Sequence, residues 1–145
     1  MNYKRNSLRA PFRTSILFED EDFVFKARSM NISEGGLLVD QIPHLPGKSL
    51  VPFMICLPYF PEFKNYSNQR LENYSSELFQ AKVLRLKGRM IQRTGMTTQV
   101  DDVFKSKFGV EFLEISPFHK KQISEYVETY TSNIIYLQRL IEQSS

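Results

Sequence analysis

The sequence predicts an all-β domain, a small antiparallel barrel or closed sheet, followed by one long α-helix. Two patterns lead to this prediction. From residue 14 to residue 115 the chain alternates short β-prone runs with turn-forming residues, whereas after Ser116 and Pro117 apolar residues recur every three or four positions. A chain of 145 residues can bury its own core without disulfides or metals. We therefore expect a single domain, 1–145, with a helical tail.

Runs with the alternation of half-buried strands are separated by turn formers or by polar stretches. They cover residues 14–19, 23–31, 36–40, 50–58, 78–88 and 107–115. The four acids "EDED" at 19–22 predict a solvated hairpin tip between the first two runs. The stretches 59–77 and 88–106 are longer than turns and are interpreted as irregular excursions.

The tail carries an apolar seam at alternating steps of four and three residues, which predicts a helix over 117–142 that begins with Pro near its first turn. The seam consists of Ile123, Val127, Tyr130, Ile134, Leu137 and Ile141. Its first half can pack on the barrel. Its distal half extends further than a small barrel covers, so it could instead meet a partner helix or a second copy of the chain.

Composition argues against several functions. His44 and His119 lie at no metal-ligand spacing from Cys, Asp or Glu, and no nucleophile motif or phosphate-binding loop is present, so we expect no metal, no cofactor and no catalysis. Cys56 has no intrachain partner, which favours a reduced thiol packed as a small hydrophobe. No apolar run reaches the roughly 18 residues that span a bilayer, and no signal peptide is visible, so we expect a soluble cytoplasmic protein.

The N-terminal stretch 1–13 is basic and contains no acid. Arg5 and Arg9 are four residues apart, at most about 13 Å in an extended chain, so both can grip one anionic ligand. Guanidinium groups form bidentate hydrogen bonds with phosphate oxygens or with the O6 and N7 edge of guanine, and they stack on purine rings. A frayed, solvated tail is the alternative. Nucleic acid is disfavoured as a partner, because a net charge of +3 gives only a small electrostatic footprint.

Residues 31–36, "NISEGG", form a second polar motif. In an extended chain Asn31 and Ser33 point to one face, while Met30 and Ile32 point to the other. Gly35 and Gly36 follow, and they can take positive φ angles without a side-chain clash, which would turn the chain sharply and leave backbone N–H groups exposed to a docked ligand. On their own these residues are also typical of an ordinary turn between two strands.

Together the two motifs resemble the PilZ domain family, whose pattern is RxxxR followed by [D/N]xSxxG. The matching residues are Arg5, Arg9, Asn31, Ser33 and Gly36. The segments "LPGKSLVPFMICLP", "AKVLRL" and "FGVEFLEISPFHKKQISEYV" are also similar to the later strands and the terminal helix of such domains. The resemblance implies a six-stranded antiparallel PilZ-like β-barrel with a long C-terminal α-helix, in a bacterial protein that binds the second messenger cyclic di-GMP.

The resemblance also implies roles for these residues. Arg5 and Arg9 would contact phosphate and guanine, and Asn31, Ser33 and Gly36 would form the wall that faces the base and phosphate. The domain would divide into a basic ligand-binding arm (1–13), a barrel (14–115) and the helix. Because Arg5 and Arg9 precede the first expected strand, the arm should be mobile without ligand. Ligand binding would order the arm, and this ordering would signal to a partner protein.

Three further residues are candidates for the same ligand. Lys4 precedes the first arginine, at a position that in similar domains helps to decide between one bound ligand and a stacked pair. Gly35 would leave room for close approach, and Arg85 could reach the ligand from a neighbouring strand. A different class of function stays open, in which the domain is a nucleotide-independent interaction module that works through its C-terminal helix, as a homodimer or with a partner.

Overall fold

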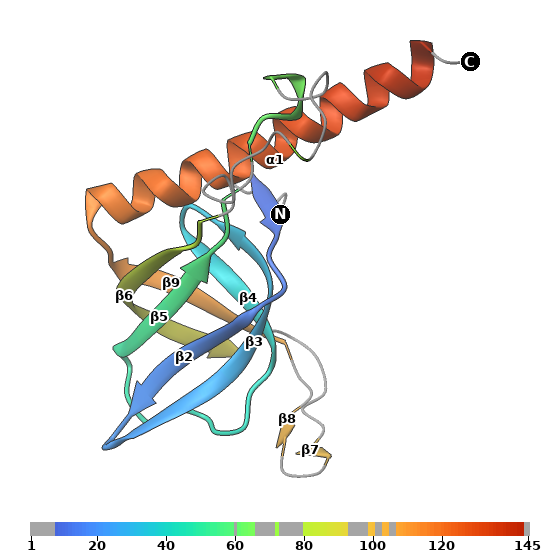
Figure 1. The fold of residues 1–145 in the computed structure, drawn as a ribbon. Helices are drawn as coiled ribbons and strands as arrows, with labels where there is room; N and C mark the ends of the chain where they lie inside the picture. The colour runs from blue at the N-terminus through green and yellow to red at the C-terminus, as the bar shows by residue number, and fades with distance from the viewer. Residues whose placement is uncertain are drawn as a thin grey trace, which may run out of the picture.

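The computed structural model describes residues 8–59, 61–65, 72, 80–92, 99–100, 103–104 and 107–143. A closed antiparallel barrel of six strands is crossed at one end by a long helix (Figure 1). The elements are β1 (Arg9–Pro11), β2 (Ser15–Asp20), β3 (Phe23–Ser33), β4 (Gly36–Gln41), β5 (Val51–Leu57), η1 (Phe63–Asn65), β6 (Lys82–Gln92), β7 (Gln99–Val100), β8 (Val103–Phe104), β9 (Phe108–Glu114) and α1 (Pro117–Gln143). The predicted fold is thus confirmed.

The barrel closes because β3 pairs on both sides. Its strands follow the order β3-β2-β5-β6-β9-β4, and β4 pairs back with β3. β1 extends the sheet beyond the end of β2, pairing Arg9 with Ser33 of β3. The expectation that Arg9 lies outside the first strand was therefore wrong: it begins a short strand of its own. β7 and β8 form a separate two-stranded sheet.

Alternation along the strands fills the barrel with apolar side chains. Ile16 and Phe18 of β2 and Ile55 of β5 are almost completely buried, and the ring of Phe18 stacks on Phe25 at 5.5 Å. Burying side chains of this size stabilises the fold by about 1.5–3 kcal/mol each. Cys56 lies between two inward-facing residues and so points outward, where it is exposed. The expectation of a packed thiol was wrong for this reason.

Among the described residues, the buried apolar side chains of α1 lie in its first half. Ile123 and Val127 are buried, but the distal seam residues Ile134 and Ile141 are 37% and 69% exposed. In Figure 1 the C-terminal half of α1 projects past the barrel. The buried Asn133 attaches η1 and its neighbours to the helix, since its Oδ1 accepts from the Phe63 N–H at 2.8 Å and its Nδ2 donates to a carbonyl of the same segment.

The expected excursion at 88–106 is partly regular structure. β6 continues through Gly88 to Gln92, and β7 and β8 lie further along. Gly88 makes this possible, because a Cβ there would lie only 2.6 Å from the carbonyl oxygen of Glu111 on β9. The sequence pattern predicted that the strand ends at Gly88. In the structure the strand continues, and glycine is required at this position because the backbones of β6 and β9 approach closely there. Of the excursion at 59–77, the described residues contain η1 as their regular element.

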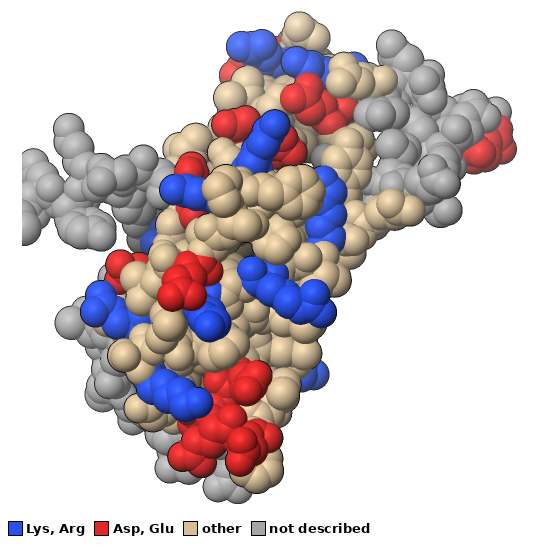
Figure 2. Space-filling model, turned by 90° about the vertical axis from the view of Figure 1, so that its left-hand side faces the viewer, with Lys and Arg blue, Asp and Glu red and all other residues tan. Residues whose placement is uncertain are grey.

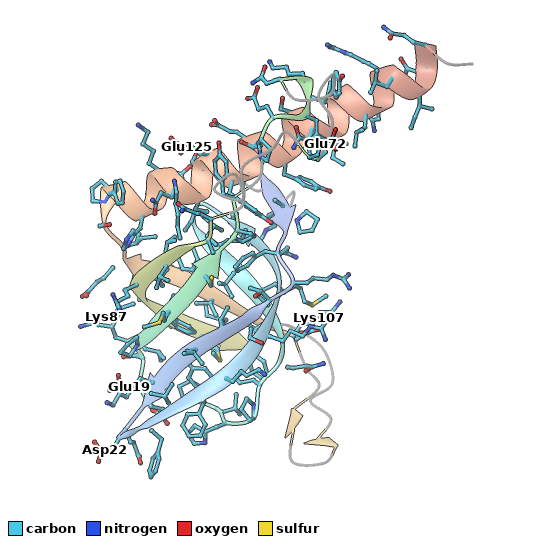
Figure 3. All side chains as sticks on the ribbon, viewed as in Figure 1. Glu19, Asp22, Glu72, Lys87, Lys107 and Glu125 are labelled. Atoms are coloured by element: carbon cyan, nitrogen blue, oxygen red, sulfur yellow. The ribbon has the colours of Figure 1, made fainter. Side chains whose placement is uncertain are left out.

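The acidic hairpin tip is only partly solvated. Glu19 and Asp22 are exposed at the end of the β2–β3 hairpin, and acidic side chains gather over this end of the barrel (Figures 2 and 3). Asp20 differs, because strand alternation turns it inward: it is 3% exposed and bonded to His44 Nε2 at 2.6 Å. The hydrogen bond with His44, helped by the Gly47 N–H, lowers the pKa of Asp20.

Candidate ligand-binding site

The pairing of β1 with β3 brings the two sequence motifs together. Arg9 lies opposite Ser33 and Pro11 opposite Asn31, so these residues share the outer face of the sheet while Ile32 points into the core. The Arg9 Nη1 donates to Asn31 Oδ1 at 2.7 Å. This hydrogen bond orients the guanidinium of Arg9 beside the carboxamide of Asn31. The side chain of Arg9 is half-buried and so already restricted in its rotamers. It therefore loses less conformational entropy when it binds an anion than a fully exposed arginine would.

The turn after Asn31 brings its backbone against a neighbouring strand. Ser33 is buried, and its Oγ donates to the Gly36 carbonyl at 3.3 Å. A Cβ on Gly36 would collide with the carbonyl oxygen of Val110 on β9, whereas one on Gly35 would meet open space. No glycine among the described residues has a positive φ, so the turn does not use the conformational freedom that the two glycines offer. Gly36 is required by close packing of the backbone.

A buried serine that the motifs do not include fixes the chain just after Arg9. Ser29 Oγ donates to the Phe12 carbonyl at 2.6 Å and accepts from the Thr14 N–H at 3.2 Å. It is fully buried, and it holds the chain between β1 and β2 against β3. Nothing in the sequence distinguishes Ser29 from an exposed strand serine, because its partners are backbone groups 15 and 17 residues away.

The remaining candidate ligand-binding residues are Lys4, Arg5 and Arg85. Lys4 and Arg5 lie outside the described residues. Arg85 is on β6, opposite Met54 of β5. β6 pairs with β5 and β9, and it stands three strands from β3 in the closed ring. The structure therefore does not bring Arg85 next to Arg9 and Asn31.

The helix contacts the chain two residues beyond Arg9. Tyr126 Oη donates to the Pro11 carbonyl at 2.8 Å, and its ring packs edge-on against Phe12 with centroids 6.0 Å apart. Burial raises the pKa of Tyr126, so the phenol stays protonated and remains a donor at neutral pH. Sequence periodicity assigned this face of α1 to packing and could not show that its contact is with the strand that carries Arg9.

These groups can bind an anion with a hydrogen-bonding edge. Arg9 offers charge and a planar fork, and Asn31 offers a carboxamide next to it. Among the described residues there is no group of three or more His, Cys, Asp or Glu side chains that could hold a metal ion. Within the same residues, no helix is long and apolar enough to cross a membrane.

The fold and this motif define a small antiparallel barrel domain with an arginine and an asparagine paired on its outer face. The family model described as PilZ domain matches residues 3–129, so the chain belongs to the PilZ domain family. PilZ domains are non-catalytic receptors for cyclic di-GMP, and the domain is accordingly not an enzyme. No curated protein sequence matches the chain significantly.

Among solved structures, the chain is similar to one titled "Structure of Bacillus subtilis Inhibitor of motility (MotI/DgrA)". The TM-score is 0.59 at 16% sequence identity, over 91% of this chain and 53% of that one. At this identity the likeness shows a shared fold. The chain spans about half the length of that protein.

Proposed function

We propose that this domain binds cyclic di-GMP through Arg5, Arg9, Asn31, Ser33 and Gly36, and passes the binding event to a partner protein in the bacterial cytoplasm. The observation that carries the proposal is the hydrogen bond between Arg9 and Asn31, two residues 22 positions apart in the sequence. It joins the two halves of the family motif on one outer face. Membership of the PilZ family supplies the identity of the ligand.

The chemistry of the ligand fits these residues. A cyclic dinucleotide presents phosphate oxygens and guanine edges, and a guanidinium can fork onto either or stack on the base. Asn31 can donate and accept at a base edge. Ser33 and Gly36 are buried and keep the turn flat against β9, which shapes the wall beside the ligand. Arg5 would close over the ligand as the N-terminal arm becomes ordered.

Calorimetric titration with cyclic di-GMP tests the proposal. We expect Arg9→Ala to weaken binding by about tenfold or more, because a charge-assisted bidentate contact is lost. Arg85→Ala removes the same charge three strands away, and we expect it to bind as the wild type does. The proposal fails if wild-type protein gives neither heat nor a thermal shift at roughly 100 μM ligand.

Helix α1 would transmit the binding of ligand to a partner protein. Arg9 and Pro11 share one short strand, and Tyr126 is bonded to Pro11, so a ligand that moves β1 also moves the contact with the helix. Pro11 and Tyr126 also line a cleft of about 330 Å³ between α1 and the barrel. Ligand binding would therefore change the wall of a surface that a partner could recognise.

Stoichiometry depends on Lys4. A long cation before Arg5 could contact a second ligand stacked on the first, so we propose a pair of bound molecules. The same titration reports it: saturation at two ligands per chain, reduced to one by Lys4→Ala, is the expected result. Saturation at one ligand in the wild type would exclude the pair and leave Lys4 without this role.

A second candidate function rests on the exposed seam of α1. The side chains of Ile134, Leu137 and Ile141 are 37–69% exposed on the distal helix. An apolar stripe of this kind favours a protein partner. In that reading the domain associates without nucleotide, and the Arg9→Ala variant associates as well as the wild type in a pull-down or sedimentation experiment.

A further inference from the structure

Three cations gather on the outer face of the barrel, close in the fold to the Arg9 motif but separate from it. Arg13 follows β1, and Lys26 and Arg28 lie on β3, on either side of the inward-facing Ala27. All three are exposed and line one hollow of about 540 Å³. Three positive charges around one hollow repel one another and create a positive potential there. An anion bound in the hollow would relieve this repulsion.

Arg13 reaches the hollow because the chain bulges outward between β1 and β2. The Phe12 N–H donates to Met30, and the Ser29 N–H donates to Thr14, which leaves Arg13 between them as the extra residue of the bulge. The buried hydroxyl of Ser29 fixes both flanks of the bulge. Bulges commonly redirect a side chain next to a functional site. Here the bulge presents the arginine beside two cations of β3.

The three cations are not engaged in direct contacts with acids of the described chain. None of them forms an ion pair or a side-chain hydrogen bond with another described residue. By contrast, Arg89 and Lys120 lie 2.9 Å and 3.6 Å from carboxylates. Asp40 is the one acid of the adjoining strand β4, and it does not line the hollow.

The other lining residues indicate a small polar ligand. The hydroxyls of Thr14 and Ser15 and the amide of Gln41 add neutral hydrogen-bond donors around the cations. Ala27 and Pro43 are the apolar residues of the lining, so the hollow lacks the large aromatic or aliphatic anchor on which a protein partner usually docks. Its volume lies within the usual range for small-molecule sites, about 300–1,000 Å³.

We propose that Arg13, Lys26 and Arg28 form a second anion-binding site, which takes the phosphate groups of a small phosphorylated ligand. Two guanidinium forks can each hold a pair of phosphate oxygens, and the lysine adds a point charge. This site uses none of the residues proposed for cyclic di-GMP. Its occupancy is therefore a separate property of the barrel, and either proposal can fail without the other.

Titration of the full chain with inorganic pyrophosphate, followed by ¹H–¹⁵N NMR, tests the site. We expect saturable shifts at Ser15, Ala27 and Gln41, with smaller ones at Asn31. In Arg13→Gln/Arg28→Gln the apparent affinity should fall about tenfold or more, because two charge-assisted contacts are removed. The matched control, Lys82→Gln/Lys121→Gln, removes two exposed charges elsewhere and should bind pyrophosphate within about twofold of the wild type. ADP in a parallel titration distinguishes a nucleotide from the bare anion.

Cyclic di-GMP binding separates the two sites. Arg9→Ala should lose cyclic di-GMP and keep pyrophosphate, and Arg13→Gln/Arg28→Gln should show the reverse. The proposal is overturned if pyrophosphate at about 10 mM shifts no resonance of the residues that line the hollow. It is also overturned if Arg13→Gln/Arg28→Gln and the control Lys82→Gln/Lys121→Gln lower the affinity for pyrophosphate equally. It is also overturned if Arg13→Gln/Arg28→Gln abolishes cyclic di-GMP binding, because the hollow would then belong to the first site. The shifts in the wild type are a measurement that needs no variant to fold.

Discussion

A methyl group on Gly36 would collide with the Val110 carbonyl oxygen of the neighbouring strand, while one on Gly35 would meet nothing within 4 Å. The two adjacent glycines of the motif therefore have different reasons for being glycine. Neither has a positive φ, so conformational strain does not distinguish them. What distinguishes them is the distance between the backbones of β4 and β9.

The substitutions Gly36→Ala and Gly35→Ala make a matched pair. We expect Gly36→Ala to lower the free energy of unfolding by about 1–3 kcal/mol, as overpacking against a backbone atom does. Gly35→Ala should leave it unchanged or raise it by about 0.5 kcal/mol, since alanine restricts the unfolded chain. Urea denaturation measures both. Equal losses in the two variants would contradict this explanation of the glycines.

Asp20 gives the molecule a pH-dependent contribution to stability. His44 and the Gly47 N–H lower its pKa in the folded state, so the stabilisation is complete above the unfolded-state pKa of about 3.9 and is lost as the pH falls through the folded value. We expect Asp20→Asn to be less stable than the wild type at pH 7, with the difference narrowing below about pH 4. Denaturation at several pH values checks this, and Asp22→Asn, at the exposed tip, should match the wild type throughout.

At the scale of elements, the side chain of Tyr126 links α1 to β1. The phenol of Tyr126 donates to Pro11, and its ring covers Phe12, so the strand that carries Arg9 cannot shift without disturbing the helix. β1 itself has only three residues, and its pairing with β3 is correspondingly short. If Arg9 binds the ligand as proposed, a strand this short, which carries Arg9 and contacts the helix, is suited to move when ligand binds.

We expect Tyr126→Phe to uncouple the helix from the ligand site. The wild type should show a change in hydrogen exchange within 117–143 when cyclic di-GMP binds, and the variant should bind the ligand with less of this change. Loss of one partly exposed hydrogen bond should cost about 0.5–1 kcal/mol of stability. Tyr130→Phe is the control on the same helix. An undiminished exchange response in Tyr126→Phe would show that α1 is reached by another route.

At the scale of the whole molecule, the distal half of α1 extends beyond the barrel (Figure 1) and exposes apolar side chains. Ile134, Leu137 and Ile141 continue the seam begun by the buried Ile123 and Val127, and Figure 1 shows this half extending past the barrel. A second copy of the chain would cover the stripe by the same contacts from both sides.

We therefore predict a homodimer through α1. Light scattering at roughly 50 μM should give a dimer mass for the full chain and a monomer mass after truncation at Thr131, because the truncation removes the exposed part of the seam. Leu137→Gln, a single change on that seam, should shift the equilibrium the same way, and Gln138→Ala should not. A monomer mass for the full chain, with and without ligand, would refute the dimer.

The sequence alone determined most of the architecture. Alternation with period two located six strands within a few residues, and a period near 3.6 located the helix, because side-chain burial repeats with the geometry of each element. The two motifs identified the family for a related reason: an arginine pair and N-x-S-x-x-G carry chemistry that few other patterns require. The errors at Gly88, at Cys56 and at the inward-facing Asp20 fell where local pattern and tertiary contact disagree, and so did the failure to predict the short strand that begins at Arg9.

The tertiary structure decided how distant residues meet. The hydrogen bond from Arg9 to Asn31 depends on β1 pairing with β3 in one register, which no local pattern encodes. The same holds for Ser29 under the bulge, for Tyr126 on Pro11 and for the hollow at Arg13, Lys26 and Arg28. Each depends on strand pairing or helix packing between segments that are distant in the sequence, because that pairing and packing fix which side chains become neighbours. The sequence determines the residue types at such a surface, and the tertiary structure determines the distances between them.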